Sequence, residues 1–129
     1  LANKAVLACI QEGWVSACHD ISMGGLYQAL IEMCLGERGL SRVGINLDIK
    51  EATSLTTLLF SENGGYVIAC DTEEWPAIEE RLTQDRVPYQ EIGKTISKKE
   101  LNITHHQEKI EIQLNKAKEA LDTYNAIKV

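Results

Sequence analysis

Residues 14–26 constrain the fold of this chain more than any other stretch. A short apolar run over residues 14–18 is followed by the polar turn 19–22, a Gly-Gly pair and a segment with helical periodicity. A buried strand, a polar turn and a helix start in this order bring backbone N–H groups close to an anionic ligand. The pattern therefore predicts a strand–turn–helix unit whose turn is a candidate binding site.

A second Gly-Gly turn lies beside a second apolar strand. The residues Ser-Glu-Asn-Gly-Gly at positions 61–65 precede a strand predicted over residues 66–70. This turn offers a hydroxyl, a carboxylate and an amide, but Asn-Gly-Gly also suits a plain turn that leads into a strand. From the residues alone, this turn is therefore either a binding site or a plain entry into the strand.

Apolar periodicity predicts the remaining elements. Helices are expected over residues 2–12, ended by Gly13, and from Ser22 as N-cap through residue 34. A further helix follows a capping box formed by Asp71 and Glu74, with Pro76 in its first turn, and a last helix starts near residue 115. Strands are expected over residues 45–49, 89–96, 100–104 and 109–114, and residues 55–60 fit a short helix or a buried run equally well. This order predicts an α+β sandwich: one mixed β-sheet with helices packed on it.

Composition bounds the class of protein. The 129 residues fit one domain, with 44% apolar and 25% charged residues and a net charge of −6. Without a basic patch or a long apolar run, neither a nucleic acid nor a membrane is expected as a partner. We find no signal peptide, and Leu1 in place of Met predicts a fragment or a trimmed chain. The four cysteines lack a CxxC pair and are predicted to be buried in a reducing compartment, with a disulfide framework as the alternative.

The first turn allows two interpretations. His19 can contact a phosphate or act as an acid or base, with Asp20 binding Mg²⁺ or orienting the imidazole, but both can equally cap the helix. Gly24 and Gly25 allow close approach either of a ligand or of another segment. His105 and His106 are expected to form a solvated pair. Because the chain lacks a complete nucleophile–base set and a Walker A loop, we expect it to catalyse nothing by itself.

The two turns carry motifs that resemble those of the C-terminal domains of the AIR synthase-related superfamily. The family pattern His-Asp-x-Ser-x-Gly-Gly-Leu is matched at residues 19–26, and its continuation Ala-Leu-x-Glu-Met at residues 29–33. A second signature, Leu-Phe-Ser-Glu before a strand, is matched at residues 59–62. Within the superfamily the chain most resembles the large synthetase component of formylglycinamidine ribonucleotide synthase.

The resemblance implies a cleft-forming domain of an ATP-dependent C–N ligase in the cytoplasm. This enzyme of purine biosynthesis converts formylglycinamide ribonucleotide and glutamine-derived ammonia into formylglycinamidine ribonucleotide. ATP and Mg²⁺ would be bound mostly by an N-terminal AIR synthase-like domain of the same chain. A glutamine amidotransferase subunit or domain would be the other partner.

The resemblance also implies a set of substrate- or nucleotide-binding residues. They are His19, Asp20, Ser22, Gly24, Gly25, Ser61, Glu62 and Asn63. Many relatives carry an Arg just after the Ser-Glu turn, whereas this chain has Gly64, Gly65 and Tyr66, so a phosphate contact there is not expected. Two alternatives remain: a related phosphotransferase of the selenophosphate or thiamine-phosphate type, and a purely structural module.

Overall fold

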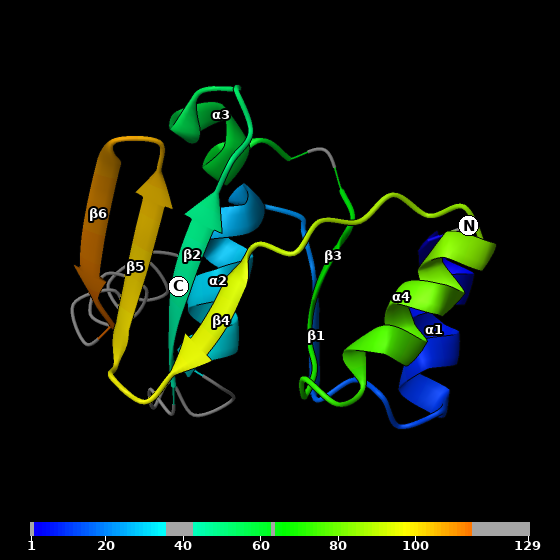
Figure 1. Ribbon diagram of the computed structural model, residues 1–129. Coiled ribbons are helices and arrows are strands. Elements are labelled where there is room, and N and C mark those ends of the chain that lie inside the picture. Colours follow the sequence, from blue (N-terminus) through cyan, green and yellow to red (C-terminus); the bar gives the residue numbers. More distant parts are fainter. Residues whose placement is uncertain (1, 36–42, 63, 115–129) are drawn as a thin grey trace, which may run out of the picture.

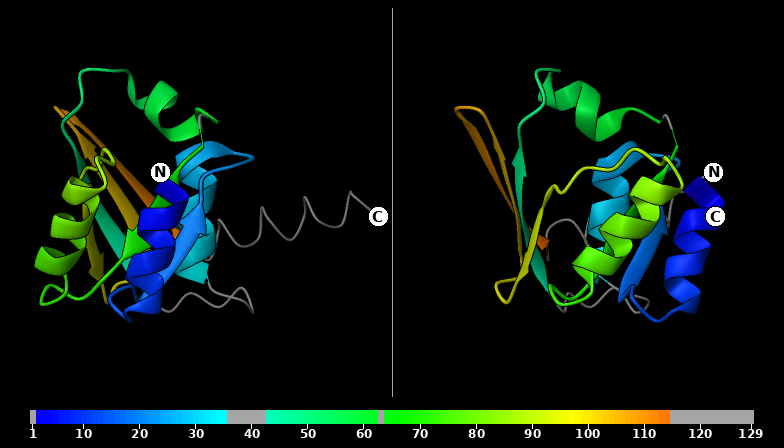
Figure 2. Two further views of the ribbon diagram at one scale, coloured as in Figure 1. Left: turned by 90° about the vertical axis from the view of Figure 1, so that its right-hand side faces the viewer. Right: turned by 45° about the vertical axis from the view of Figure 1, so that its right-hand side comes forward.

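The computed structural model describes residues 2–35, 43–62 and 64–114 of the chain. The helices are α1 (Ala2–Gln11), α2 (Gly25–Leu35), α3 (Leu55–Phe60) and α4 (Trp75–Gln84). The strands are β1 (Ala17–Asp20), β2 (Gly44–Ile49), β3 (Tyr66–Ala69), β4 (Gly93–Ile96), β5 (Glu100–His105) and β6 (Glu108–Gln113). Figure 1 shows these elements stacked in layers: a four-stranded sheet, then α2, then a ribbon of β1 and β3, then α1 beside α4. Figure 2 shows the same order from two other sides.

The four-stranded sheet is mixed, with the strand order β4-β2-β5-β6. The pair β2 and β5 is parallel, whereas β2–β4 and β5–β6 are antiparallel. Its register places Ile45 beside Leu101 and Leu47 beside Ile103, so these four side chains share one face. All four are buried, which confirms the alternation predicted for residues 45–49 and the α+β class.

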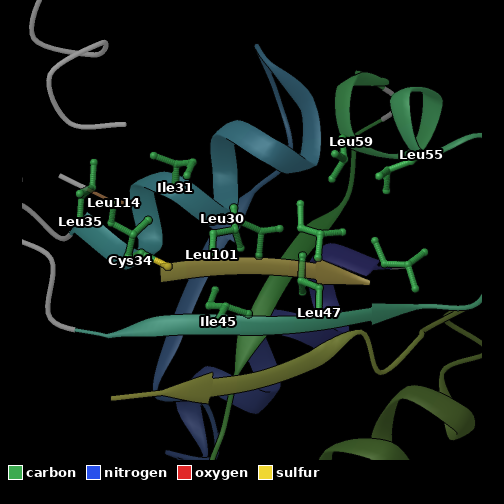
Figure 3. Close-up of a cluster of buried hydrophobic side chains, with 12 residues drawn as sticks. Leu30, Ile31, Cys34, Leu35, Ile45, Leu47, Leu55, Leu59, Leu101 and Leu114 are labelled. Carbon is green, nitrogen blue, oxygen red and sulfur yellow. The ribbon is translucent and has the colours of Figure 1, made fainter. Parts of the chain in front are cut away.

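The larger hydrophobic core lies between that face of the sheet and α2. Figure 3 shows the side chains of α2 beside those of β2 and β5, with α3 closing one end. Its fully buried members include Leu30, Ile31, Leu101, Ile103 and Leu114. Burying a side chain of this size contributes roughly 1.5–3 kcal/mol, so this core fixes α2 on the sheet.

A second core lies between the helix pair and the ribbon. Ala5 and Cys9 of α1 meet Ile78 and Leu82 of α4, and Ile68 of β3 packs against them. The apolar stripe predicted for residues 75–82 is thereby confirmed. The first helix ends at Gln11, and Gly13, which was predicted to end it, follows in the turn with φ +79°. The two cores lie on opposite sides of the β1–β3 ribbon.

Two predicted features of the sheet differ from the structure. The strands form two sheets, because β1 and β3 pair only with each other among the described residues. The first strand was expected over residues 14–18 but lies at Ala17–Asp20. The N–H of Trp14 donates to the carbonyl of Cys9, and its ring packs in the second core, so this apolar residue ends the helix turn instead of starting the strand.

Both predicted side-chain caps are wrong. The helix α2 begins at Gly25, so Ser22 lies before its start, and the Ser22 carbonyl accepts the N–H of Gly25. The N-cap of α4 is Glu74 in a helical backbone conformation, without a side-chain hydrogen bond. There a preceding turn supplies the acceptor, since the N–H of Glu74 donates to the carbonyl of Asp71.

Two expectations about polar side chains are corrected. His105 is buried, and its Nε2 lies 2.9 Å from the carbonyl oxygen of Glu51, which also contacts Nε2 of His106 at 3.0 Å. Of the cysteines, Cys9 and Cys34 are buried as expected, but Cys18 is exposed. All four thiols are free.

Residues 55–60, for which the sequence allowed two readings, form the helix α3. Its N-cap is Ser54, whose hydroxyl accepts the N–H of Thr57. The strands predicted over 89–96, 100–104 and 109–114 are present as β4, β5 and β6, with shifted ends. The helix predicted from residue 115 lies outside the described residues.

Candidate functional site

The ribbon of β1 and β3 brings the two Gly-Gly turns together. In its antiparallel register His19 lies beside Val67 and Asp20 beside Tyr66. Just beyond this pairing the N–H of Ile21 donates to the carbonyl of Gly65 at 2.8 Å. The two turns therefore lie at the same end of the ribbon, although Glu62 lies 38 positions after Gly24 in the sequence. We call this end of the ribbon, residues 19–25 with 61–62 and 64–65, the turn pair.

A direct hydrogen bond joins the two turns. The backbone N–H of Gly24 donates to Oε1 of Glu62 at 3.0 Å. The first N–H groups of a helix have no intrahelical partner, and an acidic side chain is stabilised there by the helix dipole. Glu62 therefore provides from a distant segment the acceptor that Ser22 was predicted to provide locally.

The two glycines of the first turn are required by backbone geometry and packing. Gly24 has φ +84° and Gly25 has φ +68°, a region that side chains other than glycine rarely adopt. A Cβ added at Gly25 would lie 2.7 Å from the carbonyl oxygen of Leu59 and 2.8 Å from the carbonyl carbon of Phe60. Of the two interpretations of this glycine, close approach of another segment explains its presence.

His19 is held on both sides of its ring. Nε2 lies 2.6 Å from Oε2 of Glu32, and Nδ1 lies 2.7 Å from the backbone carbonyl of Asp20. Gln28 donates to the other oxygen of Glu32 at 3.0 Å. The imidazole is thus fixed against α2, and the Asp20 carboxylate, with 65% of its side chain exposed, remains open to solvent.

The sequence interpretation missed Glu32 and Gln28 as members of this site. Both were predicted to face away from the core, and Glu32 is exposed as expected. The available signal was their spacing, because Gly24, Gln28 and Glu32 follow one another at four-residue intervals and so share a helix face. That face carries the turn pair at its N-terminal end.

The other predicted residues contribute less to this arrangement. The Ser61 N–H donates to the carbonyl of Thr57, which makes Ser61 the C-cap of α3. Ser22 is exposed, and Asn63 lies outside the described residues. Tyr66 donates its hydroxyl to Oδ1 of Asn3 at 2.5 Å and so ties β3 to α1.

The chemistry available at the turn pair is that of hydrogen-bond acceptors. Burial and, second, the Asp20 carboxylate raise the pKa of the Cys18 thiol, which disfavours a thiolate nucleophile. Among the described residues, no three His, Cys, Asp or Glu side chains are grouped so that they could hold a metal ion. In the same part of the chain, no helix is both long and apolar enough to cross a bilayer.

A shallow hollow of about 400 Å³ lies elsewhere, on the outer face of the four-stranded sheet. Its polar lining comes from Asn46, Asp48, Asn102, Thr104 and Lys109. None of its lining residues belongs to the turn pair.

Comparison with known proteins gives one family. The sequence model described as "AIR synthase related protein, C-terminal domain" matches residues 2–106, which include both turns. A phosphoribosylformylglycinamidine synthase subunit PurL of Synechocystis sp. is 36% identical over 93 residues, which are 70% of this chain and 12% of that protein. The PurL of Tropheryma whipplei is 37% identical over 105 residues, or 81% of this chain and 13% of that protein. The chain therefore spans about an eighth of the length of these relatives.

Solved structures share the fold. A crystal structure of phosphoribosylformylglycinamidine synthase II from Thermotoga maritima matches with a TM-score of 0.72 at 16% identity, over 87% of this chain and 20% of that one. The T. maritima PurL complexed with FGAR matches with a TM-score of 0.71 at 17% identity, over 87% and 19%. At these identities the similarity establishes the fold, including a mixed sheet with helices packed on it.

Proposed function

Because the chain belongs to the AIR synthase related protein, C-terminal domain family, we propose that it is a cleft-forming domain of a phosphoribosylformylglycinamidine synthase. In this role it supports the ATP-dependent conversion of formylglycinamide ribonucleotide and glutamine-derived ammonia into formylglycinamidine ribonucleotide, ADP and phosphate. The observation that carries the proposal is the family match across residues 2–106. The 36–37% identity to synthase subunits supports it.

The turn pair forms one wall of the substrate cleft in this proposal. Glu62 and Asp20 present exposed carboxylates there, and Glu32 fixes the ring of His19 at 2.6 Å. Such groups accept hydrogen bonds from the hydroxyl and amide groups of a ribonucleotide substrate. They bind and orient a ligand and perform no bond-making step, so the isolated chain is inactive.

ATP and Mg²⁺ belong to another part of the enzyme. A Mg²⁺ that accompanies ATP is held mainly by phosphates and one or two carboxylates, and no group of three His, Cys, Asp or Glu side chains suited to a metal ion is found among the described residues. We assign both to an N-terminal AIR synthase-like domain of the same polypeptide. The T. maritima PurL complexed with ATP, which shares this fold, supports the use of ATP by such an enzyme.

Two partners complete the proposed enzyme. The N-terminal AIR synthase-like domain closes the cleft from the other side, and a glutamine amidotransferase subunit or domain supplies ammonia. A structure of PurLQS from T. maritima, whose matching chain shares the fold, supports a multisubunit assembly. We place this assembly in the cytoplasm, where no nucleic acid or membrane is required as a partner.

One observation favours a second role, that of a structural module. Residues of the two motifs contact each other, since the N–H of Gly24 donates to Glu62 and Gly25 packs against the backbone of residues 59–60. Such contacts stabilise the domain whether or not a substrate binds. The two roles predict different kinetics for the same substitutions.

The test uses the full-length synthase that carries this domain, with Asp20→Asn and Glu62→Gln introduced one at a time. Loss of a hydrogen bond to a charged group is worth roughly 1.5–3 kcal/mol, so the KM for formylglycinamide ribonucleotide is expected to rise roughly tenfold or more. The control is Glu73→Gln, an exposed carboxylate outside the turn pair, which should leave KM unchanged. ADP release is measured with glutamine and with ammonium.

Unchanged kinetics in both folded variants would support the structural module instead. Synthase activity recovered from the 129 residues alone would contradict the claim that this domain needs the rest of the enzyme.

A further inference from the structure

The outer face of the four-stranded sheet carries polar side chains in rows, because the register of the strands aligns them. One row crosses the sheet from Asp48 of β2 through Thr104 of β5 to Lys109 of β6. The next row contains Asn46 and Asn102. All five residues line the hollow of about 400 Å³. The described helices lie on the other side of this sheet and leave the hollow uncovered (Figure 2).

Two opposite charges border the hollow without neutralising each other. Asp48 and Lys109 are both exposed, and neither forms an ion pair within the part of the chain that the structure describes. Neighbouring strands lie about 4.8 Å apart, so the backbones of β2 and β6 are separated by roughly 10 Å with β5 between them. The hollow therefore has an acidic group on one side and a basic group on the other, with room for a molecule that carries both charges.

The side-chain oxygen of Asn102 is a buried acceptor without a donor. The amide Nδ2 of Asn102 donates to Oδ1 of Asn46 at 2.9 Å and to Oε2 of Glu100 at 3.4 Å, and these two acceptors determine which end of the amide is the nitrogen. Oδ1 of Asn102 has no hydrogen-bond partner among the described residues. A buried acceptor left unpaired is unfavourable, so a ligand that donates a hydrogen bond to it gains affinity.

We propose that this hollow binds a free amino acid in its zwitterionic form. The ammonium group of the ligand donates to the carboxylate of Asp48 and to Oδ1 of Asn102. The carboxylate of the ligand pairs with the ammonium group of Lys109 and accepts from the hydroxyl of Thr104. Reaching the buried oxygen requires the exposed side chains around it to shift, and no ion pair among the described residues holds Asp48 or Lys109 in place.

The size and lining of the hollow suit a ligand of this kind. Small-molecule sites have volumes of roughly 300–1,000 Å³, and this one lies at the lower end of that range. Its lining is mostly polar, so it offers no apolar pocket for a ligand side chain, and free glycine and free alanine should bind alike. No residue of the turn pair takes part, so this binding is independent of the proposed function.

The test is equilibrium dialysis of the full-length protein that carries this domain against radiolabelled glycine at constant ionic strength. The wild type should bind glycine saturably. Asp48→Asn and Lys109→Met should each weaken binding at least about tenfold, because each removes a charge that forms a hydrogen bond with the ligand. Lys4→Met is the matched control, since Lys4 is exposed on α1 and does not line the hollow, and it should leave the affinity unchanged.

Competition with simpler molecules separates the two halves of the site. Acetate carries only the negative charge, methylamine carries only the positive charge, and betaine carries both charges but has no N–H group. Each should displace glycine at least about tenfold less well than alanine does. Equal displacement by any of the three would overturn the proposal, as would glycine binding that persists in both variants.

The absence of saturable glycine binding in the wild type would also overturn it and would leave the hollow to water. Asp48 and Lys109 lie on the solvent side of the sheet, so both variants are expected to fold. If one does not, the competition series on the wild type decides alone, because it needs no substitution.

Discussion

Replacing Gly25 by alanine is expected to destabilise the chain by about 3 kcal/mol. At φ +68° an alanine costs roughly 1–2 kcal/mol in backbone strain. Its Cβ would lie 2.7–2.9 Å from backbone atoms of Leu59 and Phe60, which must move, and overpacking of this kind costs roughly 1–3 kcal/mol. Reduced freedom of the unfolded chain offsets about 0.4–1 kcal/mol of the sum.

Gly13→Ala is the matched control. Its φ is +79°, so the strain is comparable, but a Cβ there meets nothing within 4 Å, and the expected loss is about 1 kcal/mol. The free energy of unfolding is measured in urea by the fluorescence of Trp14 and Trp75, which both pack in the second core. If the two variants lose the same stability, the close approach of α2 to residues 59–60 is not what requires glycine at position 25.

The remaining predictions concern the core and the thiols. Ile103→Ala should lower the free energy of unfolding by roughly 2–5 kcal/mol, because Ile103 is buried. The same change at its cross-strand neighbour Ile110, which is 38% exposed, should lower that free energy by less than about 1 kcal/mol. Equal losses of stability in urea unfolding would refute this burial pattern. Burial raises the pKa of the Cys34 thiol to about 11, so iodoacetamide at pH 8 should label the exposed Cys18 well before Cys34, as peptide mass spectrometry would show. The pKa of Cys34 in the folded chain lies above its value in the unfolded chain, so the stability that the neutral thiol contributes is present below about pH 9 and is lost as the pH rises toward 11. In Cys34→Ala this loss of stability at high pH should disappear from the pH-dependent unfolding curves.

Local patterns predicted most of the elements because those patterns reflect local physics. The alternation at residues 45–49 and the helical spacing of Ile78 and Leu82 mark the buried side of each element, and the structure buries those residues. Gly13 ends its helix because a left-handed residue is needed there. Such features depend on a few neighbouring residues, so a single sequence reveals them.

Long-range pairing was not predictable in the same way. Nothing near Ser22 indicates that Glu62 will cap α2, and without that contact Ser22 was the reasonable N-cap. The division of the described strands into two sheets likewise depends on long-range pairing, since β1 pairs with β3 across the intervening α2, β2 and α3. His105 was expected in solvent because its sequence neighbours are polar, but its place at the end of β5 turns it toward the core face.

The position of β2 has a consequence for how the chain acquires its structure during synthesis. Its two partners, β4 and β5, both follow it, and Asn46 of β2 meets a residue 56 positions later. While a ribosome builds the chain from the N-terminus, β2 emerges with both edges unpaired and with Ile45, Leu47 and Ile49 uncovered on their sheet side. Pairings of such sequence separation form slowly, and unpaired apolar strands are prone to aggregate. The nascent chain is therefore most vulnerable between the emergence of β2 and that of β5, and a chaperone that holds extended apolar segments would act in that interval.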